Sequence, residues 1–175
     1  MLEQKRTSAN TSVNLVKLPA AFVKVIPHGV VLDYGCGKYY DHIKRNAFGA
    51  GCIGYLPFDK YNQTAEVNAQ TLRFARACKG VDMVYCCNVL NVIDDAAVVQ
   101  QVVRELFDLC HDGGEIVIQI YEGDKSNHGR ETKPDCWQRN ENTKAYGRFL
   151  NGVTRYTFNT AYHGNIIHIT NVKGV

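Results

Sequence analysis

The stretch VVLDYGCG at residues 30–37 limits the possible folds of this chain, because an apolar run there ends in an aspartate and two glycines. Its apolar start is typical of a strand buried on both faces, as in a parallel sheet covered by helices. Gly35 and Gly37 predict a sharp turn with close backbone approach, which glycine adopts without steric cost. A segment with helical spacing follows at residues 39–48. Strand, glycine turn and helix form the first half of a nucleotide-binding unit, with a ligand expected at the carboxyl edge of the strand.

The details of the turn distinguish between ligands. A dinucleotide fingerprint needs a third glycine where this chain has Tyr40, and the tyrosines there would crowd a diphosphate. An acid, Asp33, instead stands two residues before Gly35, giving the pattern D-x-G-x-G. This pattern suits a ligand that carries a positive group and no phosphate.

D-x-G-x-G resembles the first motif of the class I S-adenosylmethionine-dependent methyltransferases, and the resemblance spans nearly all of the chain. It implies that Gly35 and Gly37 lie against the methionine part of the cofactor. It also implies that Asp33 helps to hold the turn and the cofactor's ammonium group. The usual motif has a further glycine at the position of Tyr39, so this copy is truncated.

The order of elements predicts an α/β fold. Strands and helices alternate as far as the apolar run at residues 115–121, which predicts a parallel sheet. Two alternating runs around residues 163–165 predict a closing hairpin. With the resemblance, we expect one domain over residues 1–175: a Rossmann-like, mostly parallel seven-stranded sheet with helices on both faces and a C-terminal antiparallel hairpin.

Composition places the chain in a broad class. The net charge of +3 is mild for a dedicated nucleic-acid binder. No apolar run reaches the roughly 18 residues of a membrane span, and the first 14 residues are too polar for a signal peptide. The seven cysteines include no C-x-x-C pair, so we interpret them as reduced thiols of a cytoplasmic protein.

Residues 1–27 are expected to form an arm and a leading helix. Pro19 suits a first helical turn, and Phe22, Val23, Val25 and Ile26 are expected on one side of the helix. The resemblance implies that this region folds over the cofactor. A helix that simply covers a sheet edge is an equal alternative.

A second strand is expected at residues 51–59, and it ends in an acid. Asp59 lies 22 residues after Gly37, near the roughly 20 expected for an acid that binds ribose hydroxyls. In the family this acid stands directly before the proline, where this chain has Leu56. Either Asp59 takes over its role or the ribose is held otherwise; we favour Asp59.

A short third strand is expected near AEVNA, residues 65–69, followed by a helix over residues 71–79. The resemblance implies that the loop after this strand flanks the adenine of the cofactor, which makes Asn68 a candidate contact. Asn68 could equally cap the helix that begins at Thr71.

A buried strand at residues 81–87 leads into Asn88 and the apolar core VLNVI, residues 89–93. Amino-methylating DNA enzymes have N-P-P-Y or D-P-P-Y here; this chain keeps Asn88, a candidate cofactor contact, but lacks the prolines and the tyrosine. Cys86 and Cys87 are interpreted as core residues, not as the nucleophile of a cytosine C5 enzyme. VLNVI resembles poorly characterised methyltransferases near DNA phosphorothioation genes and small virus-encoded relatives.

Residues 122–142 are expected to form a substrate-side loop, and residues 142–150 a helix. The resemblance implies that this loop overhangs the methyl group, so Trp137 and Arg139 are candidates to stack on or clamp a planar or anionic substrate. Alternatively, Trp137 seats the loop and Arg139 pairs with a nearby acid. Tyr121, Glu122 and Asp124 are candidates for a catalytic base, although both acids could be solvated loop residues. No metal site is expected, because His128 and Cys136 lack ligand spacing.

The sequence therefore predicts a methyltransferase of a virus, prophage or DNA-modification type. Its expected cofactor is S-adenosylmethionine, and its expected acceptor is a nucleic-acid base or a small nucleotide-like molecule. A module that binds S-adenosylmethionine without transferring a methyl group is the alternative. A nicotinamide dehydrogenase is disfavoured by Tyr40.

Overall fold

The computed structural model describes residues 17–175, whose centre is a six-stranded sheet in the order β2-β1-β3-β4-β8-β7. Neighbours among β1, β2, β3 and β4 pair in parallel, whereas β8 pairs antiparallel with β4 and with β7. The parallel core and the closing hairpin are as predicted. The strands are β1 (Gly29–Tyr34), β2 (Cys52–Phe58), β3 (Val81–Cys87), β4 (Cys110–Gln119), β7 (Tyr156–His163) and β8 (Ile166–Gly174).

The expected strand near residues 65–69 is wrong, and so is the count of seven strands. These residues begin helix α3 (Ala65–Ala77), which is capped by Thr64, whose side chain accepts a hydrogen bond from the Val67 N–H at 3.2 Å. A threonine cap followed by buried positions at Thr71 and Ala75 specifies a helix from Ala65 onward. The chain thus runs from β2 through one helix to β3, which leaves β2 at an edge of the sheet.

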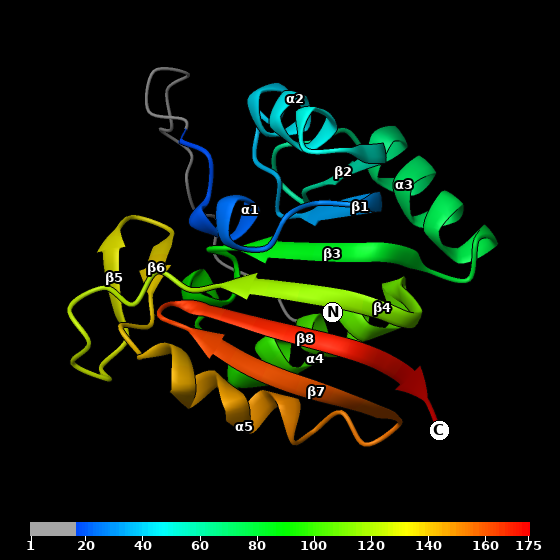
Figure 1. Cartoon of the computed structure of the whole chain (residues 1–175). Helices are drawn as coiled ribbons and strands as arrows, with labels where there is room; N and C mark the ends of the chain where they lie inside the picture. The colour runs from blue at the N-terminus through cyan, green and yellow to red at the C-terminus, as the bar shows by residue number, and fades with distance from the viewer. Residues whose placement is uncertain (1–16) are drawn as a thin grey trace.

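Helices cover both faces of the sheet (Figure 1). Helices α1 (Ala20–Lys24) and α2 (Asp41–Gly49) lie on one face, and α3, α4 (Ala96–Leu109) and α5 (Gly147–Leu150) lie on the other. The strand side chains alternate between the two faces, as the pleat of a strand requires. Facing α1 and α2 are Val31, Met83 and Val117; facing α3, α4 and α5 are Leu32, Val84 and Ile116.

The leading helix α1 is short and only partly matches its predicted apolar side. Phe22 is buried and stacks on Tyr85 with 4.0 Å between ring centroids, but Val23 and Ile26 are 66% and 64% exposed. The Ala21 N–H donates to Gln119 Oε1 at 2.8 Å, which fixes α1 at the carboxyl ends of β3 and β4. The rest of the predicted arm, residues 1–16, lies outside the described residues.

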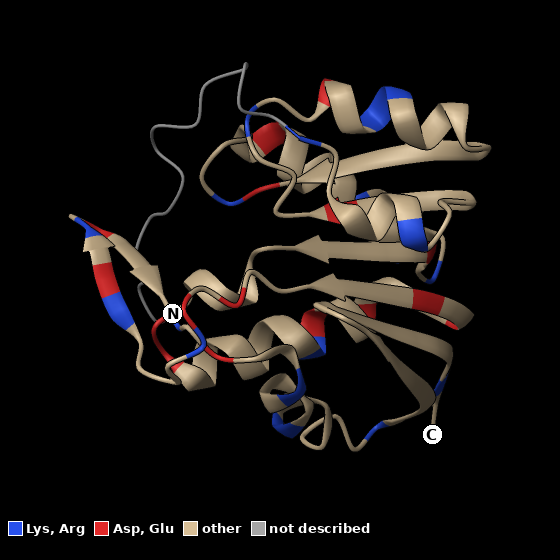
Figure 2. Ribbon diagram, turned by 60° about the vertical axis from the view of Figure 1, so that its left-hand side comes forward, with Lys and Arg blue, Asp and Glu red and all other residues tan. Residues whose placement is uncertain are grey.

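Residues 122–142 are not only a loop, because they contain a two-stranded sheet that stands apart from the main one (Figure 1). Strand β5 (Arg130–Lys133) pairs antiparallel with β6 (Cys136–Gln138). All four residues of β5 are exposed, and three of them, Arg130, Glu131 and Lys133, are charged (Figure 2). Strand β5 has no apolar residue, so the polar sequence of this hairpin has the pattern of a loop. The 3-10 helix η3 (Thr143–Tyr146) and α5 follow, where a helix was predicted.

No helix within residues 17–175 has the length and apolar character needed to cross a membrane.

The central strand β4 should carry much of the stability. Ile118 is 1% exposed, so Ile118→Ala should lower the free energy of unfolding by about 2–5 kcal/mol through lost burial and a cavity. Ile53 on the edge strand β2 is 79% exposed, so Ile53→Ala should cost less than about 1 kcal/mol. Urea unfolding of both variants measures the difference. Equal losses would contradict the assignment of β4 to the core.

Candidate functional site

A cavity of about 830 Å³ lies at the carboxyl ends of β1, β2 and β3. Its walls are the glycine turn after β1, residues 58–62 at the end of β2, residues 87–92 after β3, and one side of α4. Tyr121 and Gln138 also line it. Its volume falls within the roughly 300–1,000 Å³ of small-molecule and cofactor sites. The ligand site expected at the carboxyl edge of the sheet is therefore present as a cavity.

The glycine turn is fastened to the end of β2. The Gly35 N–H donates to the Phe58 carbonyl at 2.7 Å, and the Gly37 N–H donates to Asp59 Oδ2 at 2.9 Å. Asp59 Oδ1 accepts from the backbone N–H groups of Tyr61 and Asn62 at 2.9 and 2.8 Å. The carboxylate that bonds the turn is thus that of Asp59, whereas the resemblance gave this task to Asp33.

Both glycines have backbone angles that favour glycine, for different local reasons. Gly35 has φ +84°, and an added Cβ would lie 2.2 Å from a methyl of Val89 in the loop after β3. Gly37 has φ +72°, with nothing within 4 Å of an added Cβ. Gly35 therefore lets two loops approach closely, and Gly37 presents bare backbone to the cavity.

Asp33 is the buried acid of the site. It lines the cavity, is 2% exposed and accepts a hydrogen bond from the Tyr55 hydroxyl. Burial raises the pKa of Asp33 from 3.8 to about 7, against the lowering effect of the Tyr55 hydrogen bond, and the negative charge of Asp59 raises it further. A cation in the cavity would favour the ionised form.

Leu56, at the position where the family has its ribose-binding acid, lies inside β2 opposite Leu32 and is partly buried in the core. Asp59 directly follows β2 and lines the cavity. Asn68 lies on α3 and does not line the cavity. Its side chain brackets the Asp59 backbone, accepting from the N–H at 3.0 Å and donating to the carbonyl at 2.9 Å. It holds Asp59 in place and does not cap the helix.

Asn88 lies in the cavity wall directly after β3. Its φ of +59° is an angle that asparagine tolerates better than most residues, and its N–H donates to the Gln119 carbonyl at 2.8 Å. Asn88 thus ends β3 with a turn of the backbone toward the cavity.

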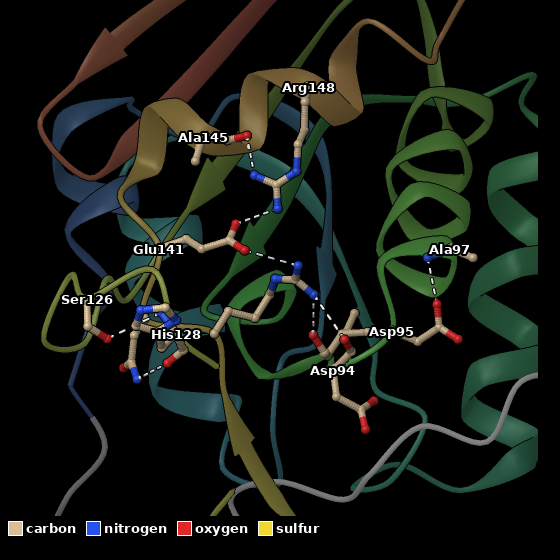
Figure 3. Close-up of polar contacts among 11 residues, drawn as sticks. Asp94, Asp95, Ala97, Ser126, His128, Glu141, Ala145 and Arg148 are labelled. Carbon is tan, nitrogen blue, oxygen red and sulfur yellow. Dashed lines mark hydrogen bonds and ion pairs between the residues drawn. The ribbon is translucent and has the colours of Figure 1, made fainter. Parts of the chain in front are cut away.

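Neither proposed substrate residue lines the cavity. The buried guanidinium of Arg139 donates to the carbonyls of Ile93 and Asp94 at 3.0 and 3.2 Å. It also pairs with Glu141 at 3.1 Å, and Figure 3 shows the Glu141 carboxylate between two guanidinium groups, one of them that of Arg148. Arg139 fastens residues 138–141 to the loop after β3.

Trp137 lies on β6 opposite Glu131, and its indole ring covers Gly129, where an added Cβ would lie 2.4 Å from the ring. This contact seats the hairpin on its own loop.

Of the three candidate bases, Tyr121 lines the cavity and is 60% exposed. Glu122 lies outside the wall: one oxygen accepts from the N–H and hydroxyl of Thr143 at 2.7 and 2.8 Å, and the other pairs with Lys125 at 2.7 Å. The Lys125 and Thr143 contacts hold the pKa of Glu122 below its usual value. Asp124 also lies outside the wall, and hydrogen bonds from Ser126 lower its pKa. The structure therefore does not bring the two acids to the site.

Among the polar residues of the cavity wall that the sequence did not predict are Asn91, Gln138 and Glu105. Asn91 is 2% exposed, and a polar residue inside the apolar run VLNVI was a signal that could have identified it. Gln138 reaches the cavity only because its hairpin docks there. Glu105 accepts from the Tyr34 hydroxyl at 2.6 Å across the interior. No group of three His, Cys, Asp or Glu within the described residues is arranged to hold a metal ion.

The fold is similar to that of solved methyltransferases. Burkholderia thailandensis 1,6-didemethyltoxoflavin-N1-methyltransferase, solved with 1,6-didemethyltoxoflavin and S-adenosylhomocysteine, has a TM-score of 0.60 at 14% identity over 89% of this chain and 76% of its own. An S-adenosylmethionine-dependent methyltransferase of Clostridium acetobutylicum has 0.55 at 11% identity over 89% of each chain. DhpI bound to S-adenosylhomocysteine has 0.53 at 13% identity over 89% of this chain and 83% of its own.

No protein-family model matches the sequence, and no curated protein matches it either. The likeness is therefore one of fold. The chain has the mixed α/β, Rossmann-like fold of the class I S-adenosylmethionine-dependent methyltransferases, with six strands in its main sheet.

The raised pKa of Asp33 predicts a pH dependence of stability. An acid whose folded-state pKa is about 7 contributes stability that is fully present below its unfolded value of 3.8 and is lost as the pH rises to about 7. Asp33→Asn removes this loss, so its free energy of unfolding relative to wild type should rise between about pH 4 and pH 7 and then level off.

Urea unfolding at intervals across that range measures this difference, with the exposed Glu66→Gln as the control. A constant difference between Asp33→Asn and wild type across the range would contradict the raised pKa.

Proposed function

We propose that this chain is an S-adenosylmethionine-dependent methyltransferase whose acceptor is a nucleobase or a small nucleotide-like molecule. The observation that carries the proposal is the cavity between the Asp33–Gly37 turn, Asp59 and the loop after β3, in a sheet of methyltransferase topology. Placement in the virus, prophage or DNA-modification subgroup stays a prediction from residues 89–93.

The residues of the turn fit the cofactor chemically. Asp33 is a buried carboxyl at the wall, and the ammonium group of S-adenosylmethionine would supply the cation that favours its ionised form. Gly37 offers bare backbone with open space beside it. Asp59 at the end of β2 stands where the two ribose hydroxyls would find a carboxylate. Two of the proteins with this fold were solved with S-adenosylhomocysteine, the product of such a cofactor.

The rim of the cavity supports a nucleotide-like acceptor. Lys17, Lys38 and Lys60 line the cavity, and none of them forms an ion pair with an acid within residues 17–175. The Lys38 and Lys60 ammonium groups lie 5.1 and 5.4 Å from the ring centroids of Tyr39 and Tyr61. Lysines attract phosphate and tyrosine faces stack on bases, so this rim suits an anionic, planar molecule.

The chain's part in the reaction is alignment. When bound, the cofactor's sulfonium supplies the methyl group, and the S–CH₃ bond breaks as the bond to the acceptor forms. The walls have to hold the acceptor atom in line with that bond and keep water out, which can supply much of the acceleration. A protonated acceptor also has to lose a proton. Tyr121 is the candidate base that lines the cavity.

A binding module without transfer is the second candidate, favoured by the position of Glu122 and Asp124 outside the cavity wall. Incubation with S-adenosylmethionine carrying a tritiated methyl group, together with DNA, RNA and a nucleotide pool, separates the two. Label in any of these acceptors supports the enzyme. Binding of S-adenosylhomocysteine by calorimetry with no label transferred supports the module. No binding of either cofactor form refutes both.

The two acids predict the effects of substitution on cofactor affinity. Asp59→Asn and Asp33→Ala should each weaken S-adenosylhomocysteine binding by about tenfold or more, because a hydrogen bond to a charged group is lost. Calorimetry measures the affinity, and circular dichroism checks that each variant is folded. Glu66→Gln makes the same acid-to-amide change as Asp59→Asn at an exposed position of α3 and should bind as wild type does. Affinities within about twofold of wild type would contradict the assignment of Asp33 and Asp59 as cofactor contacts.

A further inference from the structure

A relay of hydrogen bonds orients two amides in the wall of the cavity. Gln138 Nε2 donates to the Tyr121 carbonyl at 2.9 Å, and Asn91 Nδ2 donates to Gln138 Oε1 at 3.1 Å. A backbone carbonyl can only accept, so Tyr121 fixes which end of the Gln138 amide faces it. Gln138 then presents its oxygen to Asn91, which fixes the Asn91 amide in turn. The relay leaves Asn91 Oδ1 as its free end.

This free end is a buried acceptor with no partner. Asn91 is 2% exposed and lines the cavity, and its Oδ1 has no hydrogen-bond donor within residues 17–175. A buried acceptor without a partner destabilises the protein, and a donor on a bound molecule would remove that cost. The amide nitrogen already donates to Gln138, so the atom of the Asn91 side chain that is left wholly without a partner is the acceptor Oδ1.

The backbone around Asn91 is held independently of this relay. The Arg139 N–H donates to the Asn91 carbonyl at 2.8 Å, and the Arg139 guanidinium holds the carbonyls of Ile93 and Asp94. The Asn91–Gln138 hydrogen bond is therefore not needed to dock the hairpin. Docking alone does not explain why the side-chain amides of Asn91 and Gln138 are oriented as they are. Because Oδ1 is buried in this structure, a ligand reaches it only when side chains of the wall shift locally, as is common on binding.

We propose that Asn91 Oδ1 selects acceptors that carry an amino group on the edge of a base, with Gln138 as the positioning residue. The inference rests on the proposed function and narrows its acceptor class to amino-bearing nucleobases or nucleosides. A keto oxygen at the same edge would face Oδ1 with lone pairs on both sides, so keto bases would be rejected. The amino group is the one recognised, whichever atom receives the methyl group.

The test uses probe pairs that differ at the recognised edge. The protein is saturated with S-adenosylhomocysteine, and the affinities of adenosine and of 6-methylpurine riboside, in which a methyl replaces the amino group, are measured by ligand-observed NMR. Cytidine and uridine form a second pair. The wild type should prefer the amino member of each pair by about five- to tenfold, the range of one hydrogen bond.

Three variants locate the preference. Asn91→Leu should bring the ratio within each pair to about one, while S-adenosylhomocysteine affinity stays within about twofold of wild type. Gln138→Leu should reduce the ratio although Asn91 is intact, because the Asn91 amide is then free to rotate. If Gln138 had only a structural role, this ratio would not change. Asn46→Leu, an exposed asparagine of α2, is the matched control and should keep the wild-type ratio.

Each contrary result has a distinct meaning. Equal binding of both members, no binding of either pair, or an unchanged ratio in Asn91→Leu overturns the inference and leaves the proposed function standing. Weaker S-adenosylhomocysteine binding by Asn91→Leu would mean that Asn91 Oδ1 accepts a hydrogen bond from the cofactor and not from the methyl acceptor. That result also overturns the inference. Failure of the wild type to bind S-adenosylhomocysteine refutes the proposed function itself.

Discussion

The site depends on one carboxylate. Asp59 bonds the Gly37 N–H with one oxygen and the N–H groups of Tyr61 and Asn62 with the other, and it thereby joins the turn after β1 to the end of β2. Asn68 on α3 holds the Asp59 backbone from behind. A charged acceptor shared by three backbone donors in a buried setting gives this corner of the cavity a single geometry. The other walls are built around that corner.

The opposite wall is assembled from segments far apart in the chain. Residues 138–141 reach the loop after β3 through Arg139, whose guanidinium donates to the carbonyls of Ile93 and Asp94, directly after η2 (Leu90–Val92). The Glu141 carboxylate pairs with Arg139 through one oxygen and with Arg148 through the other. This buried network places Gln138 beside Asn91. Through Gln138, this network makes a mostly polar hairpin part of the cavity wall.

The predictions failed where local pattern and long-range contact disagree. The parallel order and the glycine turn followed from strand periodicity and from glycine positions, which are properties of short segments. Asp33 and Asp59 line the cavity because each stands at the carboxyl end of a predicted strand. The prediction of a strand at residues 65–69 was wrong because Thr64 caps a helix that begins at Ala65. The sequence left Arg139 as either a substrate contact or the partner of a nearby acid, and it pairs with Glu141. An arginine in a polar stretch gives no sign of the two carbonyls to which it also donates. Nothing near Gln138 in the sequence indicates its partner 47 residues away.

The alternation of strands and helices and the glycine turn beside the cavity are specified locally, because burial periodicity and glycine angles are properties of short segments. Which of the more distant polar groups share the cavity follows from the folded chain alone. Asn91, Gln138 and Tyr121 come from three separate elements, and their amide orientations exist only once a backbone carbonyl of one fixes the side chain of the next. Such a relay has no local signature, since each hydrogen bond is defined by the folded distance between groups and not by their spacing along the chain.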